Sequence, residues 1–189
     1  MRVVAGSKKG RELEAPKGKN TRPTLAKVKE AMFGMVQFDV EDASVLDLFA
    51  GSGALGIEAL SRGAANAVFC DADRQAASVV KANLARLGLT DSSALYCCDS
   101  IALLDVLSRE GRSFDLVLLD PPYETELASR AIERLCGLGL LNDGAIILCE
   151  HSRDNPPVVA RPELAARKAK KYGDSYVTVI IFSKSEVPV

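Results

Sequence analysis

The sequence predicts an α/β protein built on a doubly wound, mostly parallel sheet, and two observations support this prediction. Five short apolar runs, at residues 44–49, 67–70, 94–97, 114–119 and 145–149, alternate with longer Ala/Leu/Arg-rich segments of helical period. Runs that stay apolar throughout are typical of parallel strands covered on both faces. Strands that alternate with helices indicate right-handed crossovers within one sheet.

Four helices are expected between these strands, and one of them has recognisable capping residues at both ends. They cover residues 54–61, 73–87, 100–109 and 125–138, and one more helix is expected at 24–36 from its apolar spacing. Asp73 is a suitable N-cap, and Gly88 suits the position that follows a helix.

Both ends of the chain read as hairpins. Residues 2–5 and 11–14 are short strand-like pieces around 6–10, and a Pro/Gly/Lys-rich linker follows at 16–23. Residues 164–171 and 176–183 flank the turn sequence Tyr172-Gly173-Asp174-Ser175, so the sheet is expected to finish in an antiparallel hairpin as its sixth and seventh strands. We therefore divide the chain into an N-terminal hairpin and linker, 1–23, and a main domain, 24–189.

The formal net charge of -1 hides an uneven distribution. Residues 1–30 contain three acidic side chains and nine basic ones, namely Arg2, Lys8, Lys9, Arg11, Lys17, Lys19, Arg22, Lys27 and Lys29. The remaining residues are acidic overall. The two parts are therefore expected to meet different partners.

Composition excludes several classes of protein. With 189 residues of which 48% are hydrophobic, the chain can bury one core. No apolar run approaches the roughly 20 residues that span a membrane, and no signal-peptide pattern opens the chain. Five cysteines without a C-x-x-C pair and a single histidine argue against disulfides and metal sites. We expect a cytoplasmic protein with no membrane or metal partner.

A glycine loop follows the first predicted strand. Gly51, Gly53 and Gly56 match the dinucleotide fingerprint, and Asp71 stands 20 residues after the first glycine, where a ribose-binding acid is expected. The literal motif therefore predicts NAD. Asp47, however, places a carboxylate within the strand that suits an ammonium group better than a pyrophosphate, and Asp99 ends the third strand, within reach of an adenine amine. These acids favour S-adenosylmethionine over NAD.

A second motif, Asp120-Pro121-Pro122-Tyr123, ends the fourth predicted strand. Ligands of open α/β sheets bind outside the carboxyl ends of the strands, so this motif and the glycine loop should face one pocket. An Asp carboxylate and a proline carbonyl together accept the two N–H groups of an exocyclic base amine, and the tandem prolines hold these acceptors in place. Tyr123 supplies a face on which the base stacks.

These motifs resemble the RsmD family of bacterial small-subunit ribosomal RNA guanine-N2 methyltransferases. The likeness rests on Asp47-Leu-Phe-Ala-Gly-Ser-Gly53, on 120–123, on Arg2-x-x-Ala-Gly6 with Lys9-Gly10-Arg11, and on Thr21-Arg22-Pro23-Thr24. It implies a Rossmann-like S-adenosylmethionine-dependent methyltransferase fold with a seven-stranded sheet. It also implies a cofactor site formed by Asp47, Phe49, Ala50, Gly51, Gly53, Asp71, Ala72, Asp99 and Ser100, and catalytic residues Asp120, Pro121, Pro122 and Tyr123. Asp71 departs from the family, whose members more often have Glu there.

The resemblance also implies an RNA partner, either small-subunit ribosomal RNA or its assembly particle, bound by a monomer. Phosphate contacts are expected from the basic segment at Arg2, Lys8, Lys9, Arg11, Lys17, Lys19 and Arg22. A lesser basic patch at Arg167, Lys168, Lys170 and Lys171 flanks the last hairpin. His151 is expected at the surface or in a supporting position, because direct methyl transfer needs no imidazole base.

Alternatives from the same and from other classes remain open at this point. Another Asp-Pro-Pro-Tyr amino-methyltransferase would act on DNA adenine or cytosine or on a different RNA, although little sequence is left for a DNA-recognition domain. An NAD-dependent oxidoreductase would bind reduced nicotinamide. A non-catalytic RNA-binding protein would bind RNA without consuming a methyl donor.

Overall fold

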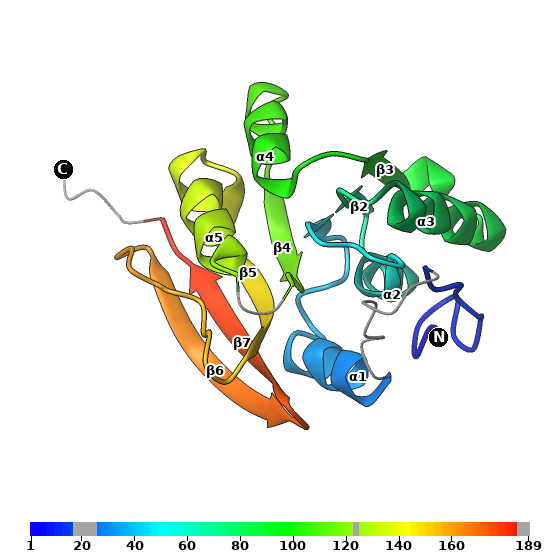
Figure 1. Ribbon diagram of the computed structural model, residues 1–189, viewed down its shortest axis with the longest axis horizontal. Helices are drawn as coiled ribbons and strands as arrows, with labels where there is room; N and C mark the ends of the chain where they lie inside the picture. The colour runs from blue at the N-terminus through cyan, green and yellow to red at the C-terminus, as the bar shows by residue number, and fades with distance from the viewer. Residues whose placement is uncertain (17–25, 123–124, 185–189) are drawn as a thin grey trace.

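The computed structural model describes residues 1–16, 26–122 and 125–184, and it confirms the α/β prediction (Figure 1). Seven strands form one sheet in the order β3-β2-β1-β4-β5-β7-β6. The strands are β1 (Ser44–Asp47), β2 (Asn66–Cys70), β3 (Ser93–Tyr96), β4 (Phe114–Leu119), β5 (Leu141–Ser152), β6 (Leu164–Tyr172) and β7 (Ser175–Phe182). Strands β1 to β5 pair in parallel, whereas β7 runs antiparallel to both β5 and β6, so the sheet ends in the expected hairpin.

The helices lie close to their predicted bounds. They are α1 (Ala26–Met35), α2 (Ala54–Ser61), α3 (Arg74–Leu87), α4 (Ser100–Arg109) and α5 (Leu127–Gly137), with a short 3-10 helix, η1 (Thr90–Ser92), before β3. The side chain of Asp73 accepts a hydrogen bond from the backbone N–H of Gln75, as an N-cap does, and Gly88 has the left-handed φ of 64° expected after α3. None of the helices that the structure describes combines the length and the apolar character needed to cross a membrane.

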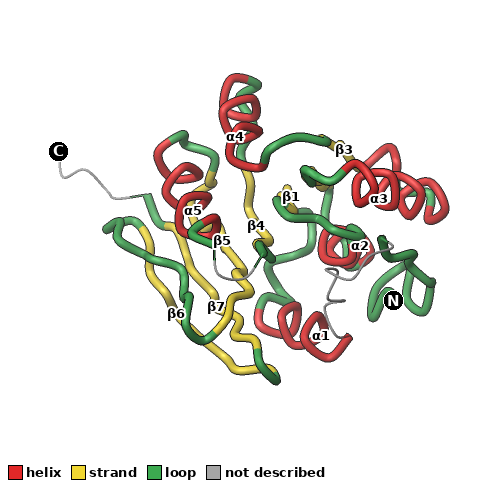
Figure 2. Tube along the Cα trace, in the orientation of Figure 1, coloured by secondary structure: helices red, strands yellow, loops and turns green. Residues whose placement is uncertain are grey.

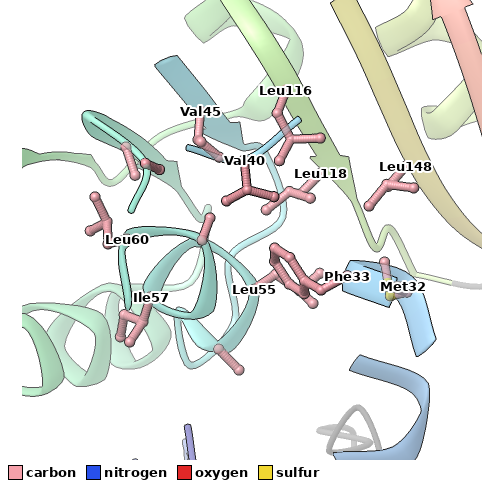
Figure 3. Packing of buried hydrophobic residues seen from close by; sticks show 14 of the residues in the cluster. Met32, Phe33, Val40, Val45, Leu55, Ile57, Leu60, Leu116, Leu118 and Leu148 are labelled. Atoms are coloured by element: carbon pink, nitrogen blue, oxygen red, sulfur yellow. The ribbon is translucent and has the colours of Figure 1, made fainter. Parts of the chain in front are cut away.

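Two apolar layers enclose the sheet. Residues of α1, α2 and α3 pack on one face, together with Val3 and Leu13 of the N-terminal segment, and residues of α4 and α5 pack on the other. Figures 1 and 2 show α1, α2 and the N-terminal segment grouped away from α4 and α5. Figure 3 shows the first layer, in which Phe33 and Leu55 lie beside Leu116 and Leu118 of β4. Both faces of the sheet are thus covered, which is why most residues of β1, β2 and β4 are apolar.

The N-terminal segment, residues 1–16, differs from its prediction. The expected hairpin is present, but Arg2 and Glu12 form an isolated bridge in place of two paired strands. The physical reason is that the backbone N–H groups of Val4 and Ala5 donate to the carboxylate of Glu58 on α2, at 2.8 and 2.9 Å. These amides therefore cannot extend a ladder, and the segment is held to α2 by its backbone.

Candidate functional site

A cavity of about 750 Å³ lies at the carboxyl ends of the parallel strands. The segments that follow β1, β2, β3 and β4 all contribute to its wall, as expected for an open α/β sheet. The predicted site residues that line it are Phe49, Ala50, Gly51, Asp71, Ala72, Asp99, Ser100, Asp120, Pro121 and Pro122. A volume of this size is typical of a pocket for a small molecule or cofactor.

The glycine loop is shaped by backbone conformations that side chains disfavour. Gly51 and Gly53 have φ values of 55° and 78°, in the left-handed region, and Gly53 is the N-cap of α2. A Cβ atom added at Gly51 would meet no heavy atom within 4 Å, and Gly51 lines the cavity, so the backbone there is open to a ligand.

The third glycine of the motif has a different role. A Cβ at Gly56 would lie 2.3 Å from Cε1 of Phe69, so Gly56 lets α2 approach β2 closely. Gly53 and Gly56 are not among the residues that line the cavity. The spacing of the glycines therefore combines one position beside the ligand space with two that build and pack the turn.

Two of the predicted cofactor-binding aspartates, Asp71 and Asp99, line the cavity. Oδ2 of Asp71 accepts a hydrogen bond from the backbone N–H of Gly51 at 2.7 Å, and its Oδ1 accepts one from the N–H of Asp73 at 2.9 Å. Oδ1 of Asp99 caps α4 by accepting from the N–H of Ala102 at 2.8 Å. Each carboxylate is thereby oriented while lining the cavity. Their oxygens retain lone pairs for hydroxyl or amine donors of a ligand.

Asp47 does not lie at the mouth of the ligand site, where it was predicted. Its side chain is buried, it does not line the cavity, and its Oδ2 accepts a hydrogen bond from the N–H of Gly56 at 2.9 Å. Burial raises the pKa of Asp47 to about 7. The geometry makes Asp47 a support for the start of α2, behind the loop that faces the ligand space.

The Asp120-Pro121-Pro122 segment lines the cavity across from the glycine loop. Pro121 is buried, and the Thr125 hydroxyl donates to the Pro122 carbonyl at 2.8 Å, which fixes the turn after β4. Tyr123, the predicted stacking face, lies outside the described residues. The acceptors expected from the motif therefore face the same space as the predicted cofactor residues.

The charged side chains on the described cavity wall are all acidic. Five of them line it, Asp71, Asp99, Asp120, Glu150 and Asp174, and the described lining residues include no Lys, Arg or His. Glu150 and Asp174 were missed by sequence reasoning, although Glu150 lies near the end of a parallel strand, where the same rule would have found it. Such a wall suits a cation and N–H donors, and it repels a pyrophosphate.

The N-terminal segment and the β6–β7 turn complete the wall. Met1, Ala15 and Pro16 line the cavity from the N-terminal segment, and Tyr172, Gly173, Asp174 and Ser175 line it from the β6–β7 turn. The turn residues were predicted as a turn, without any role in a site. Only the folding of the sheet brings this turn to the carboxyl ends of the parallel strands.

The predicted RNA-binding residues divide into three groups. Arg2, Lys9 and Arg11 are exposed and Lys8 is half-buried, and Arg2 pairs with Glu12 at 3.1 Å. Lys17, Lys19 and Arg22 lie outside the described residues, so nothing tests their role.

Lys29 belongs to the basic residues of the first 30 but does not lie at the surface. It is 2% exposed and pairs with Glu58 at 3.0 Å, because α1 turns this side chain toward the segment it helps to anchor. His151 has the supporting position, which was one of the two expected for it. It is buried, and its ring nitrogens lie 2.7 Å from the Ser152 carbonyl and 2.8 Å from the Thr178 hydroxyl. It does not line the cavity.

Comparison with known proteins adds a family and a set of structural neighbours. The family described as "Conserved hypothetical protein 95" matches residues 1–181. A Haemophilus influenzae protein named "Ribosomal RNA small subunit methyltransferase D" is 37% identical over 158 residues, covering 82% of this chain and 81% of its own.

Two solved structures resemble the whole fold. The structure of a hypothetical protein from Thermus thermophilus is 27% identical, has a TM-score of 0.79 and covers 95% of this chain and 98% of its own. An RNA methyltransferase from Salinibacter ruber in complex with S-adenosyl-L-homocysteine is 18% identical, has a TM-score of 0.66 and covers 88% of this chain and 97% of its own. At 18% identity, the likeness to the Salinibacter ruber structure shows a shared fold alone.

Proposed function

This chain belongs to the family described as "Conserved hypothetical protein 95", the RsmD family of ribosomal RNA methyltransferases, and on that premise we propose its reaction. It methylates small-subunit ribosomal RNA with S-adenosylmethionine as the donor, and the acceptor is the exocyclic N2 of a guanine. The observation that carries the proposal is the shared cavity. The glycine loop, two strand-end aspartates and Asp120-Pro121-Pro122 all line it.

The charge of the cavity supports S-adenosylmethionine over a dinucleotide. The donor is a sulfonium with an ammonium group, whereas NAD has a pyrophosphate that the five acidic lining residues would repel. In this proposal Asp71 accepts the ribose hydroxyls and Asp99 the adenine amine. Support comes from their position on the cavity wall and from the exposed backbone at Gly51, which admits close approach. The Salinibacter ruber relative, which has the same fold, was solved with the demethylated form of this donor.

The residues after β4 hold the acceptor nitrogen. When bound, the donor supplies a methyl group that is already activated on sulfur. Asp120 and the Pro121 carbonyl accept the two N–H groups of the guanine amine and turn its lone pair away from the ring, which makes the nitrogen nucleophilic. The nitrogen gains one bond to the methyl carbon as the carbon–sulfur bond of the donor breaks, which leaves S-adenosylhomocysteine. The nitrogen then releases one proton to the Asp120 carboxylate or to water. Placement supplies most of the catalysis, since no further activation of the donor is needed.

The first experiment compares Asp120→Ala with Asp71→Ala. We expect Asp120→Ala to abolish methyl transfer to a transcript of the small-subunit ribosomal RNA while binding of S-adenosylmethionine, measured by calorimetry, stays near normal. Asp71→Ala should weaken cofactor binding instead. Full transfer by Asp120→Ala would contradict the role of this carboxylate.

The modified atom is tested by mass spectrometry of the methylated transcript. N2-methylguanosine is the expected product. Methylated adenine or cytosine would contradict the guanine assignment while leaving the class of enzyme intact. Ribosomal RNA from cells that lack the protein should lose one such methyl group, and its position identifies the target nucleotide.

A further inference from the structure

The last strand pair presents a basic row that the proposed reaction leaves without a role. β6 is the edge strand of the sheet, and its basic residues Arg167, Lys168, Lys170 and Lys171 are all exposed. The cavity wall, in contrast, is acidic. A polyanion that delivers a base to this cavity must therefore find its phosphate contacts outside it.

The register of the β6–β7 pair assigns these side chains to faces. Lys168 lies opposite Val179 and Lys170 lies opposite Val177, and directly opposed residues of an antiparallel pair share one face. Val177 and Val179 belong to the apolar layer that contains α1 and the N-terminal segment. Lys168 and Lys170 therefore lie on the α1 face of the sheet.

Lys171 lies on the other face. It is opposite Tyr176, whose ring stacks on His151 with centroids 5.9 Å apart. Because side chains alternate along a strand, Lys170 and Lys171 are adjacent in sequence yet point to opposite sides of the sheet. The chain thus contains a pair of lysines that differ in face while sharing strand, charge and exposure.

The row on the α1 face leads to the cavity. The next residue on that face is Tyr172, which is half-buried against the same apolar layer and lines the cavity together with Ser175. Ala15 and Pro16 of the N-terminal segment line the cavity as well. Figure 1 shows the β6–β7 hairpin and the N-terminal segment on either side of α1. Basic side chains therefore flank the cavity from two separate elements on one side of the sheet.

We propose that Lys168 and Lys170 bind phosphates of the RNA strand whose target base enters the cavity, opposite the contacts made by the N-terminal segment. This inference rests on the proposed function. Alternate residues of an extended strand repeat about every 6.6 Å, which presents the two ammonium groups as a regular row to a backbone that carries one phosphate per nucleotide. Such contacts position the strand without reading its sequence.

A second explanation for lysines on an edge strand is protection against edge-to-edge pairing of sheets. That effect depends on charge along the edge and does not distinguish the two faces. RNA contact does distinguish them, because the face that contains Lys168 and Lys170 continues to Tyr172, which lines the cavity.

The test compares Lys170→Ala with Lys171→Ala in the full chain. Binding to a transcript of the small-subunit ribosomal RNA is measured across a series of salt concentrations. We expect Lys170→Ala to weaken binding and to reduce the slope of log affinity against log salt by about 0.7 to 0.9, the value for one phosphate contact. Lys171→Ala should leave the affinity and the salt slope near the wild-type values. The double variant, Lys168→Ala with Lys170→Ala, should lose twice as much slope as Lys170→Ala alone.

Equal effects of Lys170→Ala and Lys171→Ala, or no effect of either, would overturn the proposal. Greater self-association of both variants in size-exclusion chromatography, with the RNA slope unchanged, would assign these lysines to edge protection. Failure of the proposed function is recognised separately, because the wild-type chain would then bind the transcript without methylating it.

Discussion

The carboxylate of Glu58 is expected to be the main anchor of the N-terminal segment. It is fully buried on α2 and accepts from four donors, namely the N–H groups of Val4 and Ala5, Nζ of Lys29 at 3.0 Å and Nε of Arg62 at 2.9 Å. Replacement by Gln in Glu58→Gln keeps the shape and removes the charge. Lys29, whose side chain is 3% exposed, would then be buried without its counter-ion.

The magnitude follows from that burial. Breaking a buried pair by removing one partner costs about 3–5 kcal/mol, because the remaining charge is uncompensated. For a chain of this size, each kcal/mol lowers the melting temperature by about 2–4 °C. We therefore expect Glu58→Gln to lower the urea midpoint and to reduce the melting temperature by roughly 6–20 °C. Amide hydrogen exchange at Val4 and Ala5 should accelerate in the variant, since the Gln side chain has one acceptor oxygen in place of the two that these N–H groups bind.

Glu133→Gln is the matched control. Glu133 pairs with Arg161 at 2.9 Å, but its side chain is 60% exposed, so its loss should cost less than about 1 kcal/mol. Adding Lys29→Met to Glu58→Gln should recover part of the stability, because the unpaired charge is gone. A loss in Glu58→Gln as small as that in Glu133→Gln would refute the assignment of Glu58 as the anchor.

Two further predictions concern backbone geometry and pH. Gly6→Ala should destabilise the protein by about 1–3 kcal/mol more than Gly10→Ala in urea unfolding, because both have φ near +80° but a Cβ at Gly6 would lie 1.7 Å from the backbone oxygen of Ser61, whereas one at Gly10 meets nothing within 4 Å. Equal losses would contradict the close packing of Gly6 on α2. The raised pKa of Asp47, about 7, means that the folded state keeps a proton that the unfolded state releases from about pH 4 upward. The contribution of Asp47 to stability is therefore greatest at low pH and falls by at most about 1.4 kcal/mol per pH unit up to pH 7. Asp47→Asn should remove that fall, and an unchanged pH profile of the urea midpoint would exclude Asp47 as its source.

Much of the fold could be predicted because it depends on local patterns. The strand at 114–119 and the helices at 54–61 and 100–109 begin and end at their predicted residues. The prediction was less accurate where distant groups compete for the backbone. β1 ends at Asp47, two residues early, because the chain leaves the ladder to form the glycine loop. The N-terminal strands are reduced to one bridge because Glu58 takes their amides.

The residues of the candidate site likewise divide into those that a local pattern could place and those that depend on distant contacts. Strand-end residues such as Asp71, Asp99 and Asp120 could be placed at one cavity, because the carboxyl ends of parallel strands meet at one edge of a sheet. Asp47 could not be placed, since residue type and spacing do not tell whether a carboxylate faces a ligand or supports a helix behind it. Asp174 was missed because it belongs to a hairpin turn that only the antiparallel return of β7 brings to the cavity.

The class of fold, the family and the two motifs that meet at the cavity follow from the order of the amino acids, because each depends on a local pattern of residues. Which charged side chains are buried in ion pairs and which are exposed depends on the tertiary structure. Lys29 and Lys168 are the same residue type and look alike in the sequence. One is buried in an ion pair and holds the N-terminal segment, and the other is exposed on the edge strand. The two lysines differ because α1 packs Lys29 against Glu58 of α2, whereas no described segment covers Lys168 on the edge strand.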